Sequence, residues 1–296
     1  MSRLRALAAR SSGLLAAALV LSIPAARGGQ DAARPAGPVV RLSYRSLQPG
    51  EPVLVALGTE GTVRSASVTF LGQTAELRPA PGAGGLLAFV GIDVETKPGL
   101  HTLTVRIRKP GGLVEVVRKD LEVAAREFPS TKLRFKPEYV TPPASVAERI
   151  RREAELVALA MSVVTPEWLG DGPFEPPHPA ESWKNFGQRR LNNDVLQSLH
   201  TGLDVRVPHG EPVRASNAGT VAMASDLYFA GKTVIVDHGL GVFSTYGHMS
   251  ELLVKRGEAV KKGQTVGLCG TTGRSTGPHL HWAFKVLGAR VDPDAM

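Results

Sequence analysis

Residues 276–282 read T-G-P-H-L-H-W, a stretch that carries two histidines, His279 and His281, one residue apart. In a β-strand, the side chains at positions i and i+2 point to the same face, so both imidazoles can enter one pocket. Gly277 and Pro278 constrain how the chain enters this strand. An H-x-H pair is a weak signal by itself, and its meaning depends on the residues that accompany it.

Three more residues of the same chemical kind precede this stretch. His200 and Asp204 occur in H-T-G-L-D, and His248 occurs in T-Y-G-H-M. Imidazole and carboxylate are the ligands of a catalytic zinc ion, which keeps three protein ligands and leaves a fourth position open for water. Two histidines and one carboxylate would complete such a set and leave two histidines to transfer protons. Together with the glycine-rich T-T-G-R-S-T-G at residues 271–277, they predict one metal site.

The region around these motifs, residues 182–296, reads as glycine-rich β-structure. G-E-P-V-R-A at residues 210–215 is echoed by G-E-A-V-K-K at residues 257–262, and each unit enters a turn before another β-like run. We interpret the echo as a duplicated β-hairpin core in a compact antiparallel domain. Gly202 and the valines after Asp204 favour a turn into a strand at the first motif.

Residues 38–125 predict a second domain that is also β-structured. Turns rich in proline and glycine separate short apolar runs at residues 39–44, 53–57, 67–71, 86–90, 103–107 and 113–117. Regular short strands of this kind predict a β-sandwich, most simply an immunoglobulin-like one. No cluster of catalytic residue types occurs here, so we expect a spacer or a binding module.

Residues 126–181 form the predicted connection between the two β-domains. Ser145 and Glu148 make an S-x-x-E capping box after two prolines, and an amphipathic pattern runs from there towards Pro166. The sequence therefore predicts a short connecting helix with a charged, solvated face. A proline-rich stretch follows it.

The first 28 residues have the order of a secretory signal peptide. Arginines precede an apolar run from Gly13 to Ile23, followed by Pro24 and small residues. The run is short for a permanent span, so we expect export to the periplasm, the cell envelope or the medium, with no stable membrane insertion after cleavage. The formal net charge is +8, and arginines before residue 28 supply half of it. The remaining bias suits an anionic wall polymer and is too weak to indicate a nucleic-acid partner.

From about Ser182 to Pro293 the sequence resembles the lysostaphin-type (LytM-like) zinc endopeptidases of bacterial cell walls. The resemblance is carried by F-G-Q-R-R (186–190), H-T-G-L-D-V (200–205), G-E-P-V-R-A (210–215), Y-G-H-M (246–249), G-Q-T-V-G (263–267) and T-G-P-H-L-H-W (276–282). It implies a small antiparallel β-domain with one zinc ion per catalytic domain.

The resemblance also implies roles for individual residues. His200, Asp204 and His281 would bind the metal, and His248 and His279 would be the unliganded catalytic histidines. Which of these two histidines is the general base is left open. We further predict substrate contacts for Tyr246, Arg189 and Asn193.

The predicted function is therefore an exported zinc endopeptidase that cuts peptidoglycan cross-links or stem peptides with metal-activated water. The alternative is a non-catalytic LytM-like scaffold that binds the cell wall and activates another hydrolase, although the loss of a ligand that marks such relatives is absent. A carrier or phosphotransferase-like domain is a third reading, but it lacks an M-K-M attachment signal and fits poorly with a secretory leader. The cut bond, D-alanyl–diaminopimelate or oligoglycine, and the oligomeric state are left open.

Overall fold

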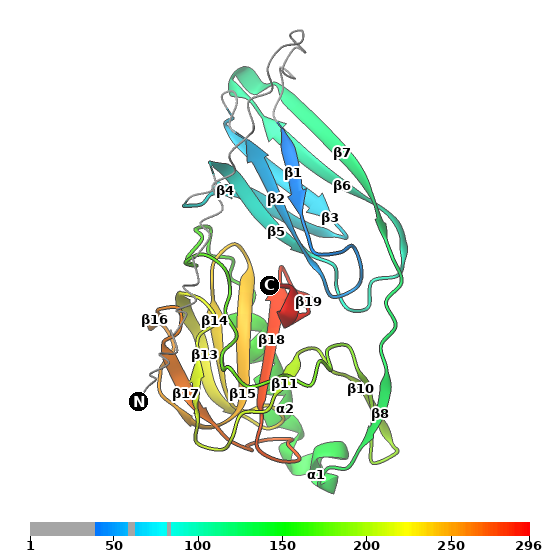
Figure 1. The fold of residues 1–296 in the computed structure, drawn as a ribbon, viewed down its shortest axis with the longest axis vertical. Coiled ribbons are helices and arrows are strands. Elements are labelled where there is room, and N and C mark those ends of the chain that lie inside the picture. Colours follow the sequence, from blue (N-terminus) through cyan, green and yellow to red (C-terminus); the bar gives the residue numbers. More distant parts are fainter. Residues whose placement is uncertain (1–38, 59–62, 82–83) are drawn as a thin grey trace, which may run out of the picture. The chain divides into compact units, whose positions relative to one another are not determined.

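The computed structural model describes residues 39–58, 63–81 and 84–296, and it is built mainly of β-strands (Figure 1). The predicted signal peptide, residues 1–28, lies outside this part of the chain. In the part described, no helix combines the length and apolar character that a membrane crossing requires.

The N-terminal β-domain is a seven-stranded sheet with the strand order β1-β2-β5-β4-β3-β6-β7. Its strands are β1 (Val40–Ser43), β2 (Pro52–Gly58), β3 (Ser65–Phe70), β4 (Gln73–Pro79), β5 (Gly85–Gly91), β6 (Gly99–Arg108) and β7 (Val114–Val123). Alternation sets its core: in β6, Leu103, Val105 and Ile107 are buried between more exposed neighbours. The predicted β-domain is thus present, but this strand order does not confirm an immunoglobulin-like topology.

The predicted helix is present as α2 (Ala144–Ala160), after a short helix α1 (Pro137–Val140). The predicted capping box is wrong. Pro143 is the N-cap residue and no side chain caps the helix, so Ser145 already lies inside the first turn. Glu148 instead pairs with Arg151 one turn later, at 2.7 Å. One apolar edge of the helix, including Val157 and Met161, packs on a small core cluster of the C-terminal domain.

The C-terminal domain is built on a nine-stranded sheet with the main order β11-β18-β15-β14-β13-β16. Its strands are β11 (Leu203–Val205), β12 (Pro212–Arg214), β13 (Gly219–Leu227), β14 (Gly231–Asp237), β15 (Val242–Leu252), β16 (Ala259–Val260), β17 (Thr265–Cys269), β18 (Leu280–Val286) and β19 (Ala289–Val291). All its pairings are antiparallel. The short helical turn η2 (Pro293–Ala295) follows β19, and a similar turn, η1 (Pro110–Gly112), lies between β6 and β7 of the N-terminal domain.

The two echoed G-E-x-V units do not form hairpins of their own, so the duplicated-hairpin interpretation is corrected. β12, from the first unit, pairs with β17, which follows the second unit. β16, from the second unit, pairs with β13, which follows the first. The strand of each unit therefore pairs with the strand that follows the other unit, and the two units share one core.

A three-stranded sheet with the order β10-β9-β8 adjoins the C-terminal domain. β9 (Arg189–Asn192) and β10 (Leu196–Leu199) form an antiparallel hairpin that ends just before His200. β8 (Ser130–Leu133) lies in the segment predicted to be a linker and pairs in parallel with β9. The predicted linker thus contributes a strand beside the predicted site.

Candidate metal centre

His200, Asp204 and His281 meet where β11 and β18 lie side by side. His200 follows β10, Asp204 is the middle residue of β11, and Asp204 lies directly opposite His281 in the register of the β11–β18 pair. Gly202 between them permits this close approach, because a Cβ atom there would lie 2.5 Å from the carbonyl oxygen of Trp282. The spacing H-x-G-x-D therefore has a steric reason.

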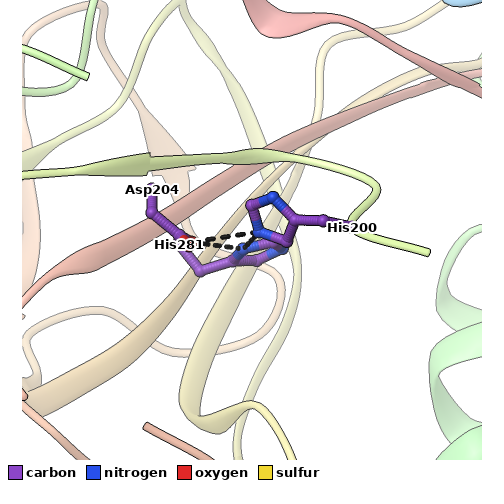
Figure 2. Close-up of side chains that lie close together, drawn as sticks. All are labelled: His200, Asp204 and His281. Atoms are coloured by element: carbon purple, nitrogen blue, oxygen red, sulfur yellow. Dashed lines mark hydrogen bonds and ion pairs between the residues drawn. The ribbon is translucent and has the colours of Figure 1, made fainter. Parts of the chain in front are cut away.

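The three side chains place one potential ligand atom each around a common point (Figure 2). Nε2 of His200 lies 3.1 Å from Oδ1 of Asp204 and 3.1 Å from Nδ1 of His281. Nδ1 of His281 lies 3.2 Å from the same carboxylate oxygen. The potential ligand atoms of the three residues, one from each, all lie within 4.8 Å of one another. They are close enough together to bind a single ion.

Neighbouring groups orient two of these ligands. Nδ1 of His200 donates to the carbonyl oxygen of Asn185 at 2.9 Å, which directs Nε2 into the cage. Oδ2 of Asp204 accepts hydrogen bonds from Asn185 at 3.0 Å and from Arg190 at 2.7 Å, so Oδ1 remains for an ion. Two nitrogens and one oxygen in this arrangement, with the outer atoms of His200 and Asp204 occupied, fit a tetrahedral zinc site with one open position.

The charge state of Asp204 suits a metal ligand. Burial raises the pKa of this carboxyl group, but hydrogen bonds from His200 and His281 outweigh burial and hold the pKa far below its ordinary value. Burial lowers the pKa of His281. An ionised carboxylate and imidazole nitrogens with free lone pairs are the forms that bind a divalent cation, so an ion that enters the cage displaces the protons through which the two imidazoles contact Asp204.

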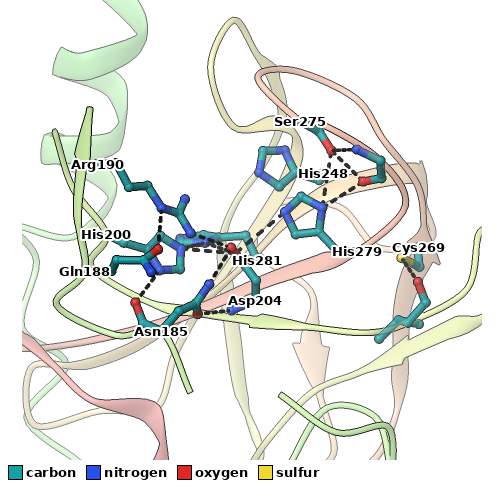
Figure 3. A network of polar contacts seen from close by, with 12 residues as sticks. Asn185, Gln188, Arg190, His200, Asp204, His248, Cys269, Ser275, His279 and His281 are labelled. Atoms are coloured by element: carbon teal, nitrogen blue, oxygen red, sulfur yellow. Dashed lines mark hydrogen bonds and ion pairs between the residues drawn. The ribbon is translucent and has the colours of Figure 1, made fainter. Parts of the chain in front are cut away.

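His248 and His279 lie beside this triad but outside it, as Figure 3 shows. Their ring centroids are 4.8 Å apart. Nδ1 of His248 donates to the carbonyl oxygen of Thr272 at 2.8 Å, and Nδ1 of His279 donates to that of Gly277 at 2.8 Å. Both rings therefore keep Nε2 free, and that of His279 lies 3.6 Å from Oδ1 of Asp204.

A β-bulge aims His248 at the site. The β14–β15 register shifts just before Met249, and His248 has a left-handed backbone with φ of 62°. A bulge of this kind turns a side chain out of the regular alternation. Burial, followed by repulsion from His279 and His281, lowers the pKa of His248 to about 3. Burial also lowers the pKa of His279, so both rings are neutral at pH 7 and can accept a proton.

The three residues predicted to contact substrate occupy different surroundings. Tyr246 is fully buried, and its hydroxyl accepts a hydrogen bond from the backbone N–H of Ser216 at 2.7 Å. Asn193 exchanges two hydrogen bonds of 2.9 Å with the backbone of Phe135. Arg189 is exposed at the start of β9. Their contacts with substrate stay a prediction.

The sequence interpretation missed three polar residues that lie at the site: Asn185, Arg190 and Arg274. Arg190 and Arg274 line a cavity of about 170 Å³ together with His200, His248 and His281. Arg190 belongs to the F-G-Q-R-R motif and Arg274 to the T-T-G-R-S-T-G stretch, so both stood inside motifs that were recognised for other reasons.

Comparison with known proteins places the site in a family context. The model of a family described as peptidase family M23 matches residues 198–293. Over 120 residues the chain is 41% identical to the peptidoglycan DD-endopeptidase ShyA of Vibrio cholerae serotype O1, a match that covers 39% of this chain and 28% of that protein. It is also 41% identical over 95 residues to the DD-carboxypeptidase/endopeptidase Mpg of Neisseria meningitidis serogroup B, covering 32% of this chain and 22% of that protein.

A likeness to a solved structure extends further along the chain. The crystal structure of a candidate M23 peptidase from Pseudomonas aeruginosa matches with a TM-score of 0.64 and 30% identity, over 84% of this chain and 94% of that one. By contrast, the chain spans only about a quarter of the length of the curated relatives named above. The shared fold thus includes residues outside the segment matched by the family model.

Proposed function

This chain belongs to peptidase family M23, and we propose that it is a zinc-dependent endopeptidase that hydrolyses peptide bonds of peptidoglycan outside the cytoplasm. One observation carries the proposal: a cage of two imidazoles and one carboxylate lies beside two neutral imidazoles with free Nε2 atoms. The peptidoglycan substrate is supported by the curated relatives, which are named as peptidoglycan DD-endopeptidases. Export is supported by the secretory pattern of the first 28 residues.

His200, Asp204 and His281 would hold the metal. A bound zinc ion supplies Lewis acidity, which makes water an effective nucleophile near neutral pH. The chain's own contribution begins with Asn185 and Arg190, which fix the orientation of Asp204 through its outer oxygen. This preorganisation keeps the ligand from rotating away when substrate enters.

His248 and His279 would move the protons of the reaction. Each is oriented by a backbone carbonyl on Nδ1 and presents Nε2 to the space above the triad. One ring takes the proton of the attacking water, and the protonated ring then donates to the leaving amine. Once protonated, that ring can also donate its Nε2–H to the oxyanion that develops on the peptide carbonyl.

The test compares two histidine variants with an exposed control. We expect His281→Ala to lose bound zinc and hydrolysis together, because the cage loses one of its ligands. His248→Ala should retain zinc and lose turnover by about 10²- to 10⁴-fold, the range typical of a general acid–base group. His209→Ala, a change at an exposed turn of the same domain, should keep both.

Metal content is measured by mass spectrometry of the purified protein. Hydrolysis is measured from the fragments released from purified peptidoglycan, with and without a chelator. Undiminished wall hydrolysis by a zinc-free His281→Ala protein would reject the proposal. A zinc-loaded wild-type protein that releases no fragments would favour the non-catalytic scaffold.

A further inference from the structure

The cavity beside the metal centre has two arginines in its wall, and the reaction as described uses only Arg190. Arg190 and Arg274 both line it, next to His248 and His281. Arg190 is neutralised by Asp204, with which it forms an ion pair at 2.7 Å. Arg274 has no such partner, since no carboxylate in the part of the chain that the structure describes forms an ion pair with it.

Two aromatic rings hold the guanidinium of Arg274 in place. Its central carbon lies 5.0 Å from the ring centroid of Phe229 and 5.7 Å from that of Phe135. The backbone N–H of Arg274 donates to the carbonyl oxygen of Phe229 at 2.8 Å, which fixes the loop as well. Stacking on rings occupies the faces of a guanidinium and leaves its N–H edge for a planar acceptor such as a carboxylate.

Phe135 is itself fixed in position. Its backbone N–H and carbonyl oxygen both pair with the side chain of Asn193, at 2.9 Å each. Phe135 precedes the segment matched by the family model, residues 198–293, so the support for Arg274 comes partly from outside that segment.

The electrostatics of the cavity favour an anion. Burial, and then repulsion from Arg190, lowers the pKa of Arg274, which shows that the site disfavours a second positive charge. An arginine nevertheless remains protonated at any physiological pH, so the cavity retains an uncompensated positive charge. A bound zinc ion would add to it. An anionic group on the substrate would relieve this repulsion and would also satisfy the free N–H edge of Arg274.

We propose that Arg274 binds a free carboxylate of the substrate next to the hydrolysed bond, and so selects carboxylate-bearing cross-links over neutral ones. The inference rests on the proposed function, because it deepens the substrate class of the same site. In a D-alanyl–diaminopimelate cross-link, a free carboxylate is attached to the carbon that bears the amide nitrogen of the cut bond. An internal bond of an oligoglycine bridge carries no such group.

The test uses a matched pair of soluble substrates: a D-alanyl–diaminopimelate cross-linked peptide dimer, and the same dimer with that carboxylate converted to its amide. We expect wild-type protein to prefer the free acid by about 10- to 100-fold in kcat/KM, the range for a hydrogen-bonded charged group. Arg274→Gln should erase the preference, because KM should rise for the acid by about 10- to 100-fold more than for the amide. Arg274→Lys should restore part of it, and Arg256→Gln, at an exposed turn, should keep the wild-type preference.

Binding separates this inference from the hydrolytic function. Zinc-loaded His248→Ala protein is titrated with both dimers by calorimetry, and the acid should bind more tightly than the amide. Adding Arg274→Gln should abolish the difference, with zinc content and thermal unfolding unchanged. If no hydrolysis occurs but the binding difference follows Arg274, the proposed function fails and the carboxylate site stands. Equal treatment of acid and amide by wild-type protein, or a preference that survives Arg274→Gln, overturns the inference.

Discussion

His238 should lower the free energy of unfolding at acid pH, although it lies outside the metal centre. Its side chain is fully buried, with Nδ1 donating to the carbonyl oxygen of Ala218 at 2.8 Å and Nε2 hydrogen-bonded to Ser244 at 2.8 Å. Phe174 packs edge-on against its ring, at 5.0 Å between centroids. Burial lowers the pKa of His238 to about 4 because the imidazolium loses its hydration there.

The magnitude follows from the difference between the two states. In the unfolded chain the pKa is near 6.5, so between pH 6.5 and about 4 the unfolded state binds a proton that the folded state refuses. The free energy of unfolding therefore rises with pH in this window, and the contribution of His238 is lost as the pH falls through it. One pKa unit corresponds to about 1.4 kcal/mol, so the full loss is about 3 kcal/mol, of which about 2 kcal/mol is lost by pH 5.

The assay compares urea unfolding of the wild-type protein and His238→Asn at pH 7, 6, 5 and 4, in chelator. Asparagine can still donate to Ala218, so the variant should be less stable at pH 7 by about 1–3 kcal/mol from lost packing and the lost contact with Ser244. Its stability should then fall less steeply, and the two curves should converge towards pH 5. All other ionisable groups are the same in both proteins, so their effects cancel in the comparison. Parallel curves from pH 6.5 to 4 would refute the reasoning.

Two further predictions concern packing near the site. Gly187 has φ of 74°, and a Cβ atom there would lie 2.0 Å from the ring of Phe128, so Gly187→Ala should destabilise by about 2–4 kcal/mol in chemical unfolding. Gly210→Ala, with φ of 86° but no atom within 4 Å of its Cβ, should cost only about 1 kcal/mol, and an equal loss would argue against a steric cause. Cys269 is fully buried and burial raises its thiol pKa to about 11, so the native protein should resist a thiol reagent at pH 8 and react fully in urea. Rapid labelling of Cys269 without denaturant would contradict the burial of its thiol in the folded protein.

Strand geometry makes part of the site predictable from the sequence, whereas the ligand set of His200, Asp204 and His281 came from the resemblance to a family. His279 and His281 are separated by the two-residue period that keeps side chains on one face. Gly202 marks a place where backbone and neighbouring strand approach too closely for a Cβ atom. Both signals lie within a few consecutive residues, so they can be recognised in the sequence without knowing the partner strand.

Register is the information that the sequence did not contain. Arg190 reaches Asp204, while the substrate contact expected of Arg189, its neighbour in β9, stays a prediction. Adjacent residues of a strand point to opposite faces, so choosing between two consecutive arginines requires the register of β9 against its partners. The predicted pairing of the G-E-x-V units was wrong for a related reason. Because the two units are similar, the sequence does not show whether each pairs with the strand that follows it or with the strand that follows the other unit.

The segment predicted to be a linker takes part in the site, and this follows from two contacts that the sequence could not reveal. β8 pairs in parallel with β9, the strand that presents Arg190 to Asp204. Phe135, just after β8, stacks on Arg274 at the edge of the same cavity. The strand has only four residues, S-T-K-L, too few to show an alternating pattern that would predict a strand, and its parallel partner is far away along the chain. Residues 130–135 therefore contact both arginines of the cavity, because β8 is the strand neighbour of Arg190 and the ring of Phe135 packs on the guanidinium of Arg274.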